Sequence, residues 1–138
     1  ALAGGEPGVL VAAEAGLQPD DSPRYSPDGE TIAFASSVQI SAATGARYVA
    51  ARTSSAAVAK TFTAVDGLPQ DLWLVDAAGG KPRLLSELKE DLPALTWSGD
   101  GKHIYVLGGT GLFDVNLRNG AARRLGEGAV HGQLDWTP

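Results

Sequence analysis

Apolar and polar positions that alternate in short runs, separated by glycine turns, predict a chain built from β-strands. Segments 31–35 and 103–107 are rich in β-branched and aromatic residues, which favour strands. In segment 111–117 the polar positions alternate with Phe113 and Val115, so the two sets of side chains face opposite sides of a strand. We therefore expect an all-β fold.

The strand pattern repeats along the chain. Segment 72–85, an apolar-aromatic run followed by a glycine turn and a basic-apolar run, aligns with segment 112–125 about forty residues later. The register continues, because segment 94–97 is echoed by segment 133–136. A period near forty residues in a strand-rich sequence is typical of β-propeller blades, which are four-stranded sheets that stack on one another.

A tight turn is also repeated. Pro27-Asp28-Gly29 is echoed by Gly99-Asp100-Gly101. Proline presets φ, aspartate caps the turn through its side chain, and glycine takes a positive φ that costs other residues energy. The turn positions that we expect to be structurally decisive are Pro27, Asp28, Gly29, Asp100, Gly101, Gly80 and Gly120.

Four strands can be assigned to each blade. For the complete blade they are 94–97, 103–107, 111–117 and 122–125. We expect four-stranded antiparallel β-propeller blades, about two to three of them, which leave the ring incomplete in a single chain. The chain then divides into an N-terminal segment with a candidate outer strand of a preceding blade (1–21), the first half of a blade (22–36), an insertion or degenerate blade (37–70), the second half of a blade (71–91), a complete blade (92–128) and the start of a next blade (129–138).

Segment 37–70 fits two interpretations. In the first, residues 38–49 are a degenerate outer hairpin that completes the first blade, and residues 62–67 open a shortened next one. In the second, the segment is one long loop or hairpin, and it is then the best candidate for a partner-specific surface. Loops longer than about 15 residues are uncommon unless they are functional, which favours the degenerate blade. The pattern leaves both open.

Composition narrows the function classes. The net charge is -5 and the 11 Lys and Arg residues are scattered, so we expect no basic groove for nucleic acid. The absence of cysteine excludes thiol catalysis, disulfides and cysteine-based zinc sites. No run of about 18 apolar residues is present, so we expect no membrane span.

Few residues are candidates for chemistry. His103 and His131 are isolated, and solvated or loop positions beside strands explain them better than zinc ligation does. The acidic residues at 20–21 and 28–30 lack the alternating spacing of a calcium loop, and Asp28 already has a role in a turn. We therefore predict no catalytic residue, no cofactor and no metal site.

Three further features have structural interpretations. Segment 108–111 lacks the lysine and the helix of a phosphate loop, so we expect a turn between strands. The charged run 87–91 is expected to be a solvated connector between blades. The recurring aromatic residues are expected to pack in the core between blades rather than to line a ligand cage, and they are Tyr25, Phe34, Trp73, Trp97, Phe113 and Trp136.

Segment 23–34, with the sequence PRYSPDGETIAF, closely resembles the repeat of TolB-type β-propellers, whose blades carry an SPDG turn followed by an IAF-like strand. Segment 71–85 is similar to the second half of that repeat. The chain departs from the family pattern at Gly99, which stands where the family has proline, and in the excess length of segment 37–70.

The resemblance implies one of two functions. A TolB-like chain is a non-catalytic scaffold for a protein or peptide partner, and the likeness favours a periplasmic or extracytoplasmic location. Similar blades form the propeller that gates substrate in prolyl oligopeptidase-family serine peptidases, including acylaminoacyl-peptidase-like enzymes. Their catalytic domain would lie outside this chain, which has no Gly-x-Ser-x-Gly elbow. We expect the scaffold, with no nucleic-acid partner and no membrane span.

The ring would be completed by further copies of the chain, as a homo-oligomer, or by the remainder of a longer chain. The sequence contains no methionine, and its last residues look like the opening of another repeat, so we expect a piece of a longer protein.

Overall fold

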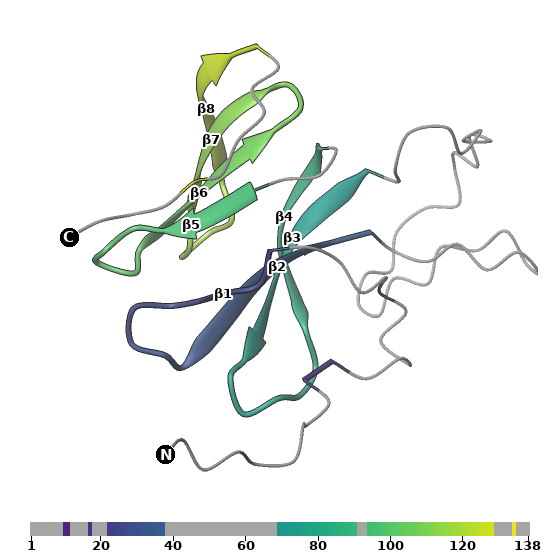
Figure 1. Cartoon of the computed structure of the whole chain (residues 1–138), viewed down its shortest axis with the longest axis vertical. Coiled ribbons are helices and arrows are strands. Elements are labelled where there is room, and N and C mark those ends of the chain that lie inside the picture. The colour runs from purple at the N-terminus through teal and green to yellow at the C-terminus, as the bar shows by residue number, and fades with distance from the viewer. Residues whose placement is uncertain are drawn as a thin grey trace, which may run out of the picture.

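The structure, a computed structural model, describes residues 10–11, 17, 22–37, 69–90, 94–128 and 134. Within these ranges the chain forms eight β-strands in two four-stranded antiparallel sheets, each a simple meander (Figure 1). The prediction of an all-β chain with four-stranded antiparallel sheets is confirmed. In the same ranges, no helix has the length and apolar character needed to cross a membrane.

The strands follow the expected segments closely. The first sheet contains β1 (Arg24–Tyr25), β2 (Thr31–Ser36), β3 (Gln70–Asp76) and β4 (Arg83–Glu90). The second sheet contains β5 (Ala94–Trp97), β6 (His103–Gly108), β7 (Gly111–Asn116) and β8 (Ala122–Glu127). In this second sheet β5 has the predicted bounds, and the other strands differ from them by one or two residues at the C-terminal end.

The turn between β1 and β2 is closed by side-chain hydrogen bonds. The Ser26 hydroxyl donates to Asp28 Oδ1 over 2.5 Å, and the Thr31 N–H donates to the Ser26 oxygen over 3.0 Å. The Glu30 N–H also donates to Asp28 Oδ1, over 3.0 Å. Gly29 has φ 76°, a left-handed conformation that suits glycine.

The turn between β5 and β6 repeats this network. The Ser98 hydroxyl donates to Asp100 Oδ1 over 2.7 Å, and the His103 N–H donates to the Ser98 oxygen over 3.0 Å. The Lys102 N–H donates to Asp100 Oδ1, and Gly101 has φ 67°. Because both turns use the same bonds, the proline at the first turn position is dispensable for this geometry.

Each sheet has two distinct faces, because side chains alternate along its strands. We define the front face of the first sheet by Ile32, Phe34, Trp73 and Val75. The equivalent front face of the second sheet carries Ile104, Val106, Phe113 and Val115. The back face carries Ala33, Leu72 and Leu74 in the first sheet, and Tyr105, Leu112 and Asp114 in the second.

The two sheets pack head to tail. The back face of the first sheet and the front face of the second form one buried cluster, which also includes Leu95 and Trp97 of β5. The front face of the first sheet packs against Leu10, Val11 and Leu17. Unlike faces therefore meet at the junction, where burial of apolar surface is the main stabilising contribution.

Strand β4 contains a bulge just before its last residue, Glu90, whose side chain is buried. Three residues of β4 lie opposite the single residue Asp71 of β3, and Asp71 Oδ1 accepts a hydrogen bond from the Lys89 N–H over 3.1 Å. Lys89 has φ 54°, and Glu90 is only 4% exposed. Residues 87–90 therefore belong to β4 rather than to a connector between sheets, and Glu87 and Lys89 are exposed as expected. Solvation is the wrong prediction for Glu90, because the bulge turns this side chain inward.

Several expectations concern residues outside the described ranges. They include most of the N-terminal segment 1–21, both interpretations of segment 37–70, and nearly all of the expected next blade at 129–138. His131 and Trp136 belong to this group, as do Asp20 and Asp21.

Candidate functional site

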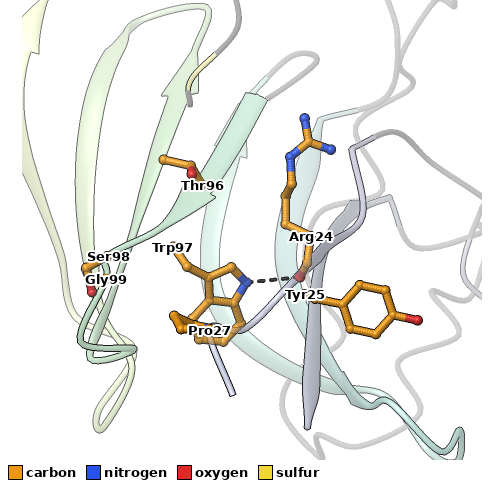
Figure 2. A pocket seen from close by; sticks show the side chains of 7 residues that line it. All are labelled: Arg24, Tyr25, Pro27, Thr96, Trp97, Ser98 and Gly99. Carbon is orange, nitrogen blue, oxygen red and sulfur yellow. Dashed lines mark hydrogen bonds between the residues drawn. The ribbon is translucent and has the colours of Figure 1, made fainter. Parts of the chain in front are cut away.

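A groove of about 280 Å³ lies where the edge strands β1 and β5 approach each other (Figure 2). One hydrogen bond joins the two strands at its floor, because the Trp97 indole N–H donates to the Arg24 carbonyl oxygen over 2.9 Å. The groove is lined by Arg24, Tyr25, Pro27, Thr96, Trp97, Ser98 and Gly99. It thus combines aromatic surface, hydroxyl groups and one guanidinium.

Tyr25 is on the surface beside this groove rather than in the core. Its side chain is 65% exposed and points away from Trp97 (Figure 2). Strand β1 is only two residues long and forms the edge of its sheet, so no further strand covers Tyr25 in the described ranges. The prediction that Tyr25 packs in the core is therefore corrected, whereas Phe34, Trp73, Trp97 and Phe113 are buried.

The carboxylates nearest the groove are engaged in their own turns. Hydrogen bonds from the Ser26 hydroxyl and then from the Glu30 N–H hold the pKa of Asp28 below its ordinary value. The equivalent bonds, first that from Ser98, lower the pKa of Asp100 in the same way. Both groups are therefore anionic at neutral pH, and their Oδ1 lone pairs are directed at turn donors rather than at the groove.

Arg24 is the charged residue among the seven that line the groove. Its Nη1 donates to the Pro23 carbonyl oxygen over 3.1 Å, and the side chain extends along the groove past Thr96 (Figure 2). A guanidinium carries five N–H donors in a fixed planar arrangement, so this single bond leaves most of them directed outward. The groove therefore offers binding groups, and no acid-base pair lies among its lining residues.

A second polar group lies at the opposite end of the sheets, where β4 meets the turn between β6 and β7. Glu90 Oε2 accepts a hydrogen bond from the Thr110 N–H over 2.9 Å, and Oε1 accepts one from the Thr110 hydroxyl. Arg124 Nη2 also donates to the Thr110 hydroxyl oxygen, over 3.1 Å. The expected turn at 108–111 is thus held by a carboxylate from the other sheet, and the arrangement is a structural one.

The back face of the second sheet carries a charged cluster. His103 Nδ1 lies 2.6 Å from Asp114 Oδ1, and Arg123 Nη2 donates to Asp114 Oδ2 over 3.2 Å. Burial acts to raise the pKa of Asp114, but the hydrogen bonds from His103 and Arg123 outweigh it and hold this pKa below its ordinary value. His103 is 34% exposed beside the turn before β6, so it is partly solvated as expected, and it is in addition a hydrogen-bonding partner of Asp114.

Metal binding has no support among the described residues. No group of three or more His, Asp or Glu side chains gathers there. Asp28 and Glu30, two of the residues considered for calcium, lie in the turn before β2, where Asp28 accepts bonds from Ser26 and from the Glu30 N–H.

Sequence reasoning missed the polar contacts because they depend on register and on packing between sheets. The His103–Asp114 pair could have been found from the short turn between β6 and β7. That turn places Tyr105 opposite Asp114, and His103 is then a diagonal neighbour on the same face. No comparable signal exists for Glu90, whose partner Thr110 belongs to the other sheet.

Comparison with known proteins identifies no family for the chain. No protein-family model matches it, and no curated protein sequence matches it at a significant level. The likeness to TolB-type repeats therefore remains a resemblance of motifs.

Proposed function

We propose that the two sheets are consecutive blades of a TolB-like β-propeller, and that this propeller is a non-catalytic scaffold for a protein or peptide partner. The observation that carries the proposal is the head-to-tail packing of two equivalent sheets. An interface between unlike faces can be repeated from one unit to the next. Such a repeat generates a closed ring when the rotations that relate successive units add up to a full turn. A β-propeller is such a ring.

The position of the groove supports a binding role. In this arrangement β1 and β5 are the innermost strands of their blades, so the groove opens toward the centre of the ring. Its exposed lining residues include Tyr25 and Arg24, which belong to the residue types that dominate protein interfaces. Rigid strands hold them in place, which limits the entropy lost when a partner binds.

Selection of peptides from a random display library on the purified chain tests this role. We expect selected peptides to lose affinity at least about tenfold when Arg24→Ala removes the exposed guanidinium from the groove. Arg123→Ala, at an exposed position on β8, is the matched control and should leave affinity unchanged. Peptides that bind both variants equally well would show that the groove is not the binding surface.

The native mass, measured by light scattering coupled to size exclusion, tests the ring. A dimer or trimer that is stable on dilution means that copies of this chain complete the propeller. A monomer places the remaining blades in other segments of a longer chain. Hydrogen exchange on that monomer must then show Tyr105 and Leu112 on the back face of the second sheet less protected than Leu72 and Leu74, and equal protection would contradict continued stacking.

A further inference from the structure

We infer that Asn119 is a site of spontaneous deamidation, and that the isoaspartate formed there loosens the junction between the two sheets. Asn119 and Gly120 lie in the turn between β7 and β8, and the asparagine is exposed. The modification requires water as its co-reactant and no enzyme, so it goes beyond the proposed scaffold function and does not depend on it.

The reaction takes place between two neighbouring residues. The Gly120 nitrogen loses its proton to hydroxide and attacks Asn119 Cγ, the Cγ–Nδ2 bond breaks, and ammonia leaves a five-membered succinimide ring. Water then opens the ring at one of its two carbonyl carbons. Breaking the bond from the nitrogen to Cγ gives aspartate, whereas breaking the bond to the main-chain carbonyl carbon gives isoaspartate, whose main chain is one carbon longer. Glycine favours the attack because it has no Cβ to crowd the nitrogen.

The side chain of Asn119 is already folded toward this nitrogen. Its Oδ1 accepts a hydrogen bond from the Ala121 N–H over 3.0 Å, which folds the side chain back over the peptide bond that contains the Gly120 nitrogen. The same bond draws electron density from the carbonyl group under attack. One bond opposes the reaction, because the Gly120 N–H donates to the Asn116 carbonyl oxygen over 2.8 Å and must open first. Asn119 and Ala121 are both exposed, and local opening requires little free energy at such a turn.

Two similar turns carry a carboxylate where this one carries an amide. Asp28 and Asp100 each precede a glycine in the left-handed region, as Asn119 does. Hydrogen bonds within their turns hold the pKa of both aspartates below its ordinary value, so both are anionic at neutral pH. A carboxylate anion resists attack by a nucleophile, whereas the uncharged amide of Asn119 does not.

Isoaspartate at this position acts on the junction through Gly120. A Cβ added at Gly120 would overlap the carbonyl oxygen of Leu85 in β4, so the glycine lies directly against the first sheet. The additional main-chain carbon displaces Gly120, and the bond to Asn116 that closes the turn is lost. Aspartate keeps the original main-chain length and an oxygen that accepts the Ala121 N–H, so this second product leaves the junction intact.

Ageing of the purified chain at mildly alkaline pH tests the reaction. Trypsin cleaves after Arg118 and Arg123, which releases a peptide of residues 119–123 for mass spectrometry. Asn116 is the internal control, because it is the other asparagine of the chain and the bulky Leu117 follows it. We expect the amide of Asn119 to convert to an acid at least about tenfold faster than that of Asn116. Equal rates at the two positions would overturn the inference.

Variants at the same position test the effect on the junction. Asn119→Asp has the normal main chain and should melt within about 1 °C of the parent. The converted chain, separated from the parent by anion exchange, contains isoaspartate and should show a component that melts about 4 °C or more below Asn119→Asp. Asn119→Gln should resist ageing, because its attack would close a larger ring that forms more slowly. Absence of the early-melting component, or an equal loss on ageing of Asn119→Gln, would contradict the proposed link between Asn119 and the junction.

Discussion

Glu90 accepts hydrogen bonds from both the main-chain N–H and the hydroxyl of Thr110, and it thereby joins the last residue of β4 to the turn between β6 and β7. The carboxylate is almost completely buried, and a Cβ added at Gly108 would lie 2.6 Å from Glu90 Cγ. Because Gly108 has no side chain, Glu90 of β4 can approach β6 closely and reach Thr110, which connects the two sheets.

Replacement of Glu90 should therefore weaken the junction between the sheets. Glu90→Ala removes both hydrogen bonds to Thr110, but Thr110 is exposed and water can replace the lost acceptor, so we expect the free energy of unfolding to fall by about 1–2 kcal/mol. Urea denaturation measures the change. Glu87→Ala, at an exposed position of the same strand, is the control and should stay within about 0.5 kcal/mol of the parent. Equal effects of the two substitutions would mean that the Thr110 contact contributes nothing.

Gly29→Ala should be destabilising for conformational reasons alone. Gly29 has φ 76°, and a Cβ placed there would meet nothing within 4 Å. The expected cost is therefore that of a left-handed conformation in a non-glycine residue, about 1–2 kcal/mol. A melting temperature equal to that of the parent would show that the turn does not constrain this position. Gly126→Ala, where a Cβ also meets nothing within 4 Å, controls for the added methyl group.

Gly120→Ala should be more damaging than Gly29→Ala, although both glycines have similar φ values of 70° and 76°. A Cβ at Gly120 would overlap the carbonyl oxygen of Leu85, which belongs to the other sheet. The substitution must move the two sheets apart in addition to straining the turn, so we expect a loss at least about 2 kcal/mol larger. Thermal unfolding of the two variants side by side gives the difference, and similar melting temperatures would contradict the close approach.

Trp97→Phe should lower the free energy of unfolding by about 1–3 kcal/mol, because it removes the bond to the Arg24 carbonyl oxygen and leaves a small cavity. Tyr25→Ala, in the same groove but on an exposed side chain, should change stability by less than about 0.5 kcal/mol. Guanidinium chloride unfolding separates the two outcomes. A larger loss for Tyr25→Ala would mean that Tyr25 packs against other residues.

Stability should fall in acid through the two turn aspartates. The pKa values of Asp28 and Asp100 are lower in the folded chain than their ordinary value of 3.8. The anionic forms therefore stabilise the fold at pH values above this ordinary value, and the contribution disappears as the pH falls through the folded-state pKa values. The double variant D28N/D100N should be less stable than the parent at pH 7 and lose less stability between about pH 5 and pH 2. Parallel pH profiles for the two proteins would contradict this assignment.

The sequence predicts local features of this fold well. Turn chemistry at Asp28 and Asp100 located the first hairpin of each sheet. Alternation of apolar and polar residues located the strands of the second sheet within one or two residues. These features depend on neighbours in sequence, such as Ser26 with Asp28. Burial of the aromatic residues on long strands follows from the same alternation, as Phe113 illustrates.

Features that depend on distant neighbours could not be predicted in the same way. The charged composition of segment 87–91 suggested solvent exposure, but the partner that buries Glu90 belongs to another sheet. Tyr25 has the residue type of a core position and lies on a strand too short to be covered. The groove itself exists only because two edge strands from different repeats come together, which no single repeat encodes.

Leu74 and Asp114 occupy the same position in the two repeats, on the back faces of the first and second sheets. Leu74 is fully buried in the apolar junction, whereas Asp114 is bound to His103 and Arg123. Exchanging the repeats would bring Asp114, with its partners His103 and Arg123, into an apolar contact, where burying charged groups costs desolvation free energy. The two sheets share one strand pattern but are not interchangeable, because a single side chain, Leu74 or Asp114, suits only one of the two positions along the chain.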